Sequence, residues 1–201
     1  MNDPWDLVTR NFAARFGDRS AARGWFVPGR IEVFGKHVDY AGGRSLLAAI
    51  DRGFFVLARP RRDAQVHIVD ARFHQSYSGI IDADLPQARG TWSDYVVTVL
   101  RRMARDFPGA TVGMDAVIGS TLPSAAGLSS STALVIASFL PLAAFNRLEA
   151  RAEWAANLAS TPQLAGYLGA VENGRAFGTF AADFGVGTQG GAQAHLAILA
   201  C

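Results

Sequence analysis

The chain has 201 residues, of which half are apolar and 18% are charged. This balance is typical of a folded globular protein with a proper core and argues against a disordered chain. The net charge of +2 comes from scattered arginines without a basic stripe, so we predict no nucleic-acid partner. The single cysteine, Cys201, excludes an internal disulfide. Because the N-terminus lacks a signal-peptide pattern and no apolar run could span a membrane, we expect a cytoplasmic protein without a membrane partner; its oligomeric state is not indicated.

The first predicted element is a helix over residues 4–16. Asp3 and Pro4 form a helix-start signal, apolar residues then recur at helical spacing, and Gly17 ends the pattern. We expect this helix to pack on the body of the protein.

A run of strand patterns follows, interrupted at Pro28 and Gly29. Strands are predicted over residues 25–27, 31–34, 52–59, 65–70 and 73–80. His67 and His74 fall within these patterns without a carboxylate or cysteine at metal-ligand spacing, so they are interpreted as sheet residues.

A dense polar set lies among glycines between residues 29 and 43. Its members are Arg30, Glu32, Lys36, His37, Asp39 and Tyr40. Such a set suits recognition of a hydroxyl-rich small molecule, in which each hydroxyl meets a donor or an acceptor. A polar surface loop would have the same composition.

The second half of the chain alternates predicted helices with one strand. The helices cover residues 91–107, about 130–146 with a bend or an interruption near Pro141, 149–159 and 162–177, and the strand covers 112–118. The basic face of the first helix, which carries Arg101, Arg102 and Arg105, is predicted to be solvated. Glu172 is a lone carboxylate available to a metal or an arginine, and the tail after Gly191 is predicted as an apolar strand.

Residues 121–137 form the stretch with the clearest chemistry. A small-residue loop around Gly127 runs into three serines and then into an apolar helical pattern. The first helical amides lack intrahelical partners, and with the helix dipole and the hydroxyls they form a cradle for phosphate oxygens. A serine oxygen there can also be a ligand to the magnesium that accompanies a nucleotide.

The serine loop and the other glycine motifs have alternative interpretations. A serine-rich helix cap would look the same as the loop. A nucleophile elbow fails because no glycine stands two residues after Ser129, and a Walker-type loop fails because the spacing from Gly29 to Lys36 is one residue too long. GVGTQG at 185–190 matches a dinucleotide fingerprint, but residues 191–201 contain no acidic residue to hold a ribose.

Three segments together resemble the GHMP small-molecule kinases, and galactokinases in particular. GRIEVFGKHVDYAGG at 29–43 is similar to the galactokinase sugar signature, PSAAGLSSSTA at 123–133 to the family's phosphate loop, and AVEN at 170–173 to its glutamate-containing segment. The three stand in the family's order across nearly the whole chain. The resemblance implies an α+β fold with a mixed sheet backed by helices, in a two-layer arrangement like that of ribosomal proteins.

The resemblance also implies ATP with Mg²⁺ and a sugar as phosphoryl acceptor. It places the nucleotide phosphates on Pro123, Ala126, Gly127, Leu128, Ser129, Ser130, Ser131 and Thr132. It assigns Ser131 and Glu172 to the metal, Arg30 to the transferred phosphoryl group, and Glu32, Lys36, His37, Asp39 and Tyr40 to the sugar side. Positioning and charge neutralisation are the main requirements of phosphoryl transfer.

Three departures from the family pattern matter. Lys36 stands where the family has glutamate, which argues against plain galactose and suggests an acceptor carrying a carboxylate or phosphate. Glu32 replaces an asparagine. Thr188 occupies the position of the catalytic aspartate, and a hydroxyl is no general base at neutral pH. Asp183 could substitute, transfer could proceed without a base, or the protein could bind without turnover.

The domain expectation follows from the same resemblance. Residues 1–201 are expected to form the N-terminal domain that binds sugar and ATP phosphates, truncated before the family's C-terminal domain. On this view the fragment need not be active even if the whole protein is a sugar kinase.

Overall fold

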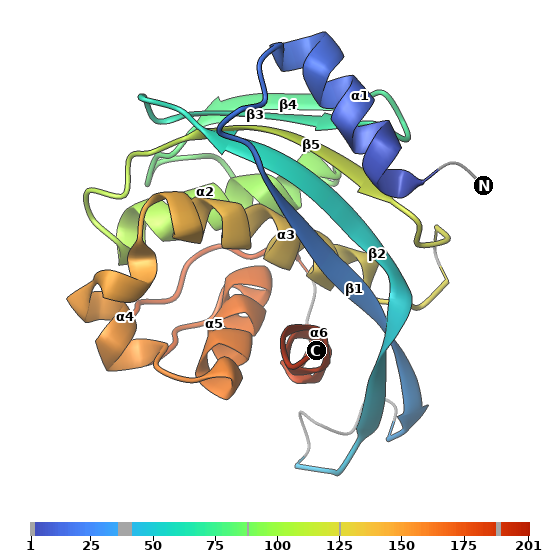
Figure 1. Cartoon of the computed structure of the whole chain (residues 1–201). Coiled ribbons are helices and arrows are strands. Elements are labelled where there is room, and N and C mark those ends of the chain that lie inside the picture. Colours follow the sequence, from blue (N-terminus) through green and yellow to red (C-terminus); the bar gives the residue numbers. More distant parts are fainter. Residues whose placement is uncertain (1–2, 36–41, 88, 125, 188–189) are drawn as a thin grey trace.

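The computed structural model describes residues 3–35, 42–87, 89–124, 126–187 and 190–201. A five-stranded sheet carries one helix on one face and the remaining helices on the other (Figure 1). The strands are β1 (Arg23–Phe34), β2 (Leu46–Pro60), β3 (Gln65–Asp70), β4 (Ser76–Ile80) and β5 (Met114–Ser120). The helices are α1 (Pro4–Phe16), α2 (Ser93–Asp106), α3 (Ser130–Phe145), α4 (Ala152–Asn157), α5 (Thr161–Asn173) and α6 (Gln193–Leu199), with a 3₁₀ turn at Leu148–Ala150. This mixed sheet backed by helices confirms the predicted α+β class.

The sheet order is β1-β2-β5-β3-β4. β3 and β5 are parallel, and the other neighbouring strands are antiparallel. The central strand β5 is buried along its length except at Ser120, as expected for a strand covered on both faces. The loop from β5 to α3 therefore leaves the middle of the sheet, which is where the predicted phosphate loop lies.

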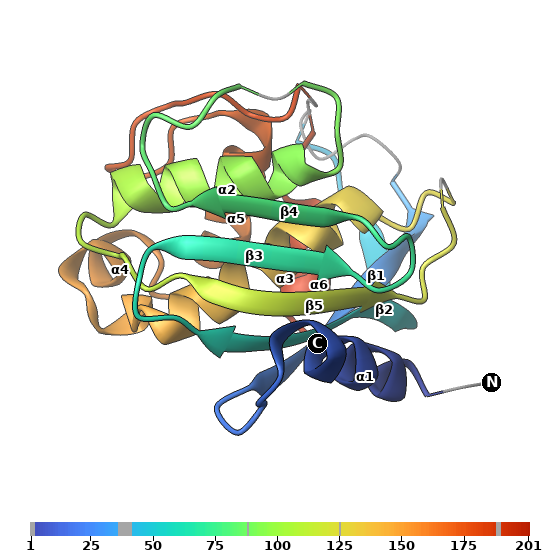
Figure 2. The same ribbon diagram turned by 90° about the horizontal axis from the view of Figure 1, so that it is seen from above.

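Helix α1 lies alone on the outer face of the sheet, across β2 and β5 (Figure 2). Its N-terminus is capped by Asp3, whose carboxylate accepts a 2.9 Å hydrogen bond from the Trp5 amide, and Gly17 ends it with φ of 73°. The fully buried Val8 and Phe12 pack with Val117 of β5 in a small separate core. The predicted N-terminal helix is confirmed in position and in its packing role.

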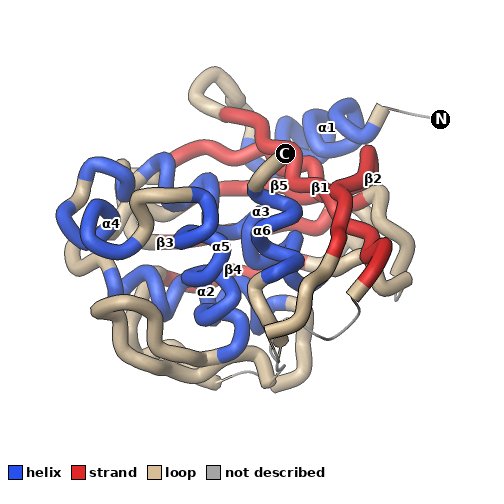
Figure 3. The backbone as a smooth tube through the Cα atoms, turned by 90° about the horizontal axis from the view of Figure 1, so that it is seen from below, coloured by secondary structure: helices blue, strands red, loops and turns tan. Residues whose placement is uncertain are grey.

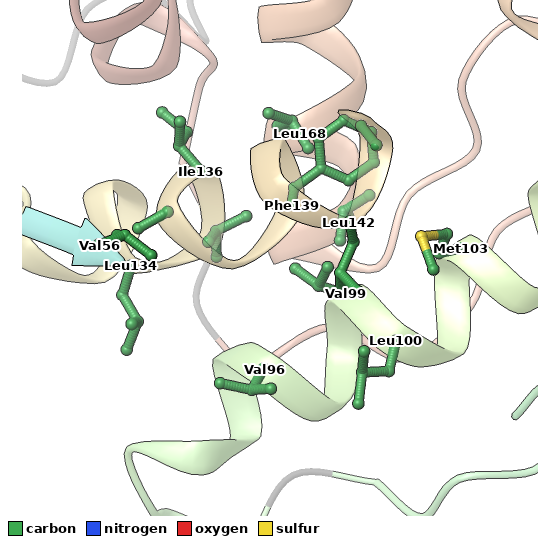
Figure 4. Close-up of a cluster of buried hydrophobic side chains, with 14 of the residues drawn as sticks. Val56, Val96, Val99, Leu100, Met103, Leu134, Ile136, Phe139, Leu142 and Leu168 are labelled. Carbon is green, nitrogen blue, oxygen red and sulfur yellow. The ribbon is translucent and has the colours of Figure 1, made fainter. Parts of the chain in front are cut away.

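The main core lies between the opposite face of the sheet and the other helices (Figure 3). Figure 4 shows side chains of α2, α3 and α5 meeting there, with Leu142 of α3 beside Val99 of α2 and Phe139 of α3 beside Leu168 of α5. Helix α3 continues through Pro141 instead of breaking, and it is apolar all round as a fully covered helix should be. Among the described residues, no helix is long and apolar enough to cross a membrane.

The structure corrects two strand predictions near the N-terminus. β1 is one continuous strand, and the predicted interruption at Pro28 is a register shift between Pro28 and Arg30. Proline is tolerated because β1 is an edge strand. Gly53 lies opposite, where a Cβ would come within 2.2 Å of the Val27 carbonyl oxygen, so only glycine allows this approach. His74 lies in the loop before β4, with φ of 54°.

Two predictions in the second half are also wrong. The tail forms helix α6 instead of a strand, because Ala194 and Ile198, four residues apart, share a buried face. Arg101 and Arg102 are 1% exposed, not solvated, since each guanidinium is neutralised by a carboxylate. Arg105 remains exposed at 44% of its side chain.

Candidate functional site

The N-terminus of α3 is open toward solvent. Ser129 precedes the helix in a left-handed conformation with φ of 58°, and its side chain makes no capping hydrogen bond. Its carbonyl accepts from the Ala133 amide, which leaves the amides of residues 130–132 without intrahelical partners. The first turn contains no acidic side chain. The serines therefore do not cap the helix in the ordinary way, and the helix end is free to bind an anion.

A cavity of about 300 Å³ lies directly at this helix end. Its lining consists of Arg30, Ala126, Gly127, Leu128, Ser129, Ser130 and Ser131. Seven of the residues predicted from the sequence thus surround one space. Gly127 has φ of 70°, a conformation that favours glycine and exposes the loop backbone to a ligand.

Arg30 joins β1 to the predicted phosphate loop. Its Nη1 donates to the Gly127 carbonyl at 3.1 Å, and its backbone amide donates to the Leu128 carbonyl at 3.2 Å. Its Nε is buried and has no partner within the described chain. Arg30 therefore contributes a fixed positive charge to the cavity with one donor still available.

Glu172 of α5 lies behind the loop and is 5% exposed. The Thr132 hydroxyl donates to its Oε2 at 3.2 Å. Nε2 of His195, on α6, lies 3.0 Å from the same oxygen, although the ring N–H direction does not give a hydrogen bond. A carboxylate, a hydroxyl and an imidazole therefore meet at one point between α3, α5 and α6.

Tyr95 of α2 connects this point to the phosphate loop. Its hydroxyl neighbours Ser131. Burial raises the pKa of Tyr95, the charge of Glu172 raises it further, and Ser131 lowers it slightly. The phenol therefore stays protonated at neutral pH, and Ser131 and Glu172, the two predicted metal residues, share Tyr95 as a neighbour.

Asp183 does not line this cavity. Its Oδ2 accepts from Nε of Arg101 at 2.7 Å and its Oδ1 from Nη1 of Arg105 at 2.9 Å. Burial raises the pKa of Asp183, but the arginine hydrogen bonds outweigh it, so that the pKa is lowered overall. A carboxylate bound to two arginines is a weak base, so these contacts weigh against Asp183 as the general base, which stays a prediction.

The sugar side is described only in part. Glu32 lies 3.6 Å from Nη2 of Arg30, and Oε1 of Glu32 accepts from Gln193 of α6 at 3.4 Å. Lys36, His37, Asp39, Tyr40 and Thr188 lie outside the described residues, so their predicted roles stay predictions. Pro123 is exposed on the loop before the cavity and is not part of its lining.

Three residues near this site are not indicated by the sequence. His195 and Gln193 lie in the tail predicted as a strand, and Tyr95 lies in a predicted amphipathic helix. None lies in a motif, so only their meeting in three dimensions identifies them. In the described part of the chain, no group of three or more His, Cys, Asp or Glu residues is arranged to hold a metal.

Comparison with known proteins covers both halves of the site. The galactokinase galactose-binding signature matches residues 10–60, which include Arg30 and Glu32. The N-terminal domain of GHMP kinases matches residues 94–174, which include the loop and Glu172.

Curated relatives are galactokinases. That of Lacticaseibacillus casei (strain BL23) is 37% identical over 131 residues, covering 63% of this chain and 33% of the relative. That of Roseiflexus sp. (strain RS-1) is 38% identical over 135 residues, covering 66% of this chain and 33% of the relative. The matched part of the chain thus spans about a third of these relatives.

Solved structures give the same fold over nearly the whole chain. Lactococcus lactis galactokinase complexed with galactose superposes with a TM-score of 0.76 and 26% identity, over 95% of this chain and 45% of that one. Methanococcus jannaschii mevalonate kinase superposes with a TM-score of 0.69 and 15% identity, over 91% and 52%, which supports the fold alone. With both family regions matched and the same fold, the chain belongs to the galactokinase and GHMP kinase family, of which it matches the N-terminal portion.

Proposed function

We propose that this chain is the nucleotide- and sugar-binding half of a kinase that transfers the γ-phosphoryl group of ATP to a sugar hydroxyl. The observation that carries the proposal is the uncapped N-terminus of α3, which opens into a cavity of about 300 Å³ beside Arg30. Helix-end amides and serine hydroxyls bind phosphate oxygens there, and the arginine neutralises charge that develops during transfer.

Magnesium is the proposed companion of the nucleotide. The residues fit a hard cation, since the buried carboxylate of Glu172 accepts from the Thr132 hydroxyl and the adjacent Ser131 lines the cavity. When bound, the ion would neutralise charge on the phosphates. The chain's own contribution is to hold these oxygens in place, with Thr132 fixing the carboxylate.

The acceptor is proposed to be galactose or a derivative of it. The match to the galactose-binding signature and the galactose-bound relative support a sugar. Lys36 stands where the family has an acidic residue, so a sugar acid or sugar phosphate is the finer proposal. Comparing galacturonate and galactose 1-phosphate with galactose as acceptors tests it, and equal rates for the three would contradict a role for Lys36.

The second candidate function is a sugar-binding relative that does not transfer phosphate. Two points favour it: the resemblance puts Thr188 at the position of the family's catalytic aspartate, and Asp183, earlier in the same segment of sequence, is paired with Arg101 and Arg105. The variant Thr188→Asp separates the two functions. If transfer proceeds without a base, the wild type is active and the variant gains about 10²-fold or more; if the protein only binds, the wild type shows sugar binding without ATP consumption.

The deciding experiment has two stages. Calorimetric titration of the chain with MgATP tests the phosphate site, with Ser131→Ala expected to weaken binding about tenfold. ATP consumption by the complete gene product is then measured over a panel of hexoses and sugar acids. Absence of nucleotide binding in the first stage would refute the proposed function, whatever the acceptor.

A further inference from the structure

His195 is a buried imidazole whose two nitrogens have no hydrogen-bond partner within the described chain. The side chain is 2% exposed and lies on α6, between α5 and the N-terminal half of α3. Leaving a buried polar group unpaired costs about 1–3 kcal/mol, so such a group calls for a physical explanation.

The geometry of the ring toward Glu172 points to a third atom. Nε2 lies 3.0 Å from Oε2 of Glu172, yet the direction of the ring N–H, which is also that of the lone pair of a neutral ring, misses the oxygen. Two ligands at right angles on an ion about 2.1 Å from each are about 3.0 Å apart, and the lone pair then points at the ion and not at the other ligand. The 3.0 Å distance from Nε2 to Oε2 and the orientation of the ring away from Oε2 agree with two ligands that share one ion.

Further oxygen donors stand around the same point. Thr132 lies 3.2 Å from Oε2 of Glu172, and the adjacent Ser131 lines the phosphate cavity. The described chain offers no third His, Cys, Asp or Glu here. The remaining positions around an ion would therefore be filled by nucleotide phosphate oxygens and water, as is usual for nucleotide-bound metals.

We propose that His195 and Glu172 together bind the divalent ion that accompanies the nucleotide, and that the imidazole shifts the preference of this site from Mg²⁺ toward first-row transition ions such as Co²⁺. Mg²⁺ prefers six oxygen ligands, whereas imidazole nitrogen is a good ligand for the later first-row ions. The inference rests on the proposed function for its nucleotide, but the pair of protein ligands stands on geometry alone.

Spectroscopy tests the ligand without relying on activity. Co²⁺ is titrated into the chain, with and without a non-hydrolysable ATP analogue, and its visible ligand-field absorption is recorded. Wild type should develop bands of nitrogen-ligated Co²⁺ that are lost in His195→Gln. His74→Gln is the matched control, because His74 is exposed in the loop before β4, and it should leave the bands unchanged.

Metal preference is the second measurement. The analogue's affinity is determined with Co²⁺ and with Mg²⁺, and the ratio of the two should fall about tenfold or more in His195→Gln relative to wild type. If His195→Gln does not fold, as judged by circular dichroism, His195→Asn replaces it with the same expected losses.

The outcomes separate this inference from the proposed function. Nucleotide binding with an unchanged Co²⁺ to Mg²⁺ ratio and no His-dependent bands would overturn the metal inference and leave the kinase proposal intact. Absence of nucleotide binding with either ion would refute the kinase proposal, and His-dependent bands with Co²⁺ alone would still support the ligand pair.

Discussion

Nε of Arg101 donates to Oδ2 of Asp183 at 2.7 Å, and both side chains are 2% exposed. This pair joins α2 to the segment that follows α5, across 82 positions of sequence. Arg101 also donates to the Pro86 carbonyl at 2.7 Å, so one buried guanidinium fixes two loops. The segment that follows α5 is therefore anchored to α2 at Asp183.

Asp183→Asn should destabilise the protein by about 3 kcal/mol, since removing one charge of a buried pair leaves the other uncompensated. Denaturant unfolding measures the change. Arg105→Gln is the control, because Arg105 contacts the same carboxylate from an exposed position and should cost less than about 1 kcal/mol. Equal losses in both variants would contradict the assignment of the buried pair as the anchor.

The pKa of Asp183 predicts a dependence of stability on pH. Burial raises its pKa, but the hydrogen bonds from Arg101 and the Phe184 backbone, with the charges of Arg101 and Arg105, outweigh burial and lower the pKa in the folded state. Its stabilisation is therefore complete above the unfolded-state pKa of about 3.9 and is lost as the pH falls below it toward the folded pKa. The unfolding free energy of wild type should fall more steeply than that of Asp183→Asn between about pH 5 and pH 2. Parallel curves would show that Asp183 is not the group responsible.

The close contact of β1 with the phosphate loop predicts the effect of a single methyl group. A Cβ on Gly29 would come within 2.6 Å of Leu122 Cδ2 and 2.9 Å of the Leu128 carbonyl oxygen. Gly29→Ala should therefore displace the loop, destabilise the protein by about 1–3 kcal/mol and weaken nucleotide binding. Gly190→Ala is the control for stability, since nothing lies within 4 Å of its Cβ position. Thermal unfolding and ATP-analogue titration of both variants test the prediction.

Packing around Phe139 predicts a larger loss of folding stability. Its ring is stacked on Trp154 at 6.3 Å and meets Tyr167 edge to face at 5.8 Å, deep in the core of Figure 4. Phe139→Ala should cost about 3–5 kcal/mol through lost burial and a residual cavity. Phe34→Ala, at a side chain that is 70% exposed on β1, should change stability by less than about 0.5 kcal/mol. A similar cost at both positions would contradict the core assignment.

The sequence predicted what local chemistry decides. Capping at Asp3, the glycine at 17 and the open serine loop depend on neighbours in sequence, and α1 and the loop at α3 have the predicted form. The tail was misassigned because an apolar run fits either a strand or a helix until its packing partners are known. Residues 194 and 198 pack as a helix because α5, β1 and β2 offer them one common surface.

Long-range pairing explains the other differences. The solvated face predicted for α2 is wrong because Asp183, far along the chain, returns to neutralise Arg101. His195 meets Glu172 for the same reason, through the return of α6 against α5. No periodicity or motif encodes which charge meets which, so such partners emerge only from the folded chain.

Tyr95 provides the last prediction, which concerns binding and not stability. Its hydroxyl neighbours Ser131, which lines the cavity at the start of α3, and the raised pKa keeps the phenol protonated at neutral pH. Tyr95→Phe removes the hydroxyl and keeps the ring, so affinity for the ATP analogue should fall about fivefold, equivalent to about 1 kcal/mol, with little change in thermal unfolding. Tyr77→Phe on β4 is the matched control, because the pKa of Tyr77 is raised by burial alone and this phenol is not part of the cavity lining. Unchanged affinity in Tyr95→Phe would mean that the Ser131 hydroxyl is positioned without Tyr95, and the helix-end amides would then be the main contacts to phosphate.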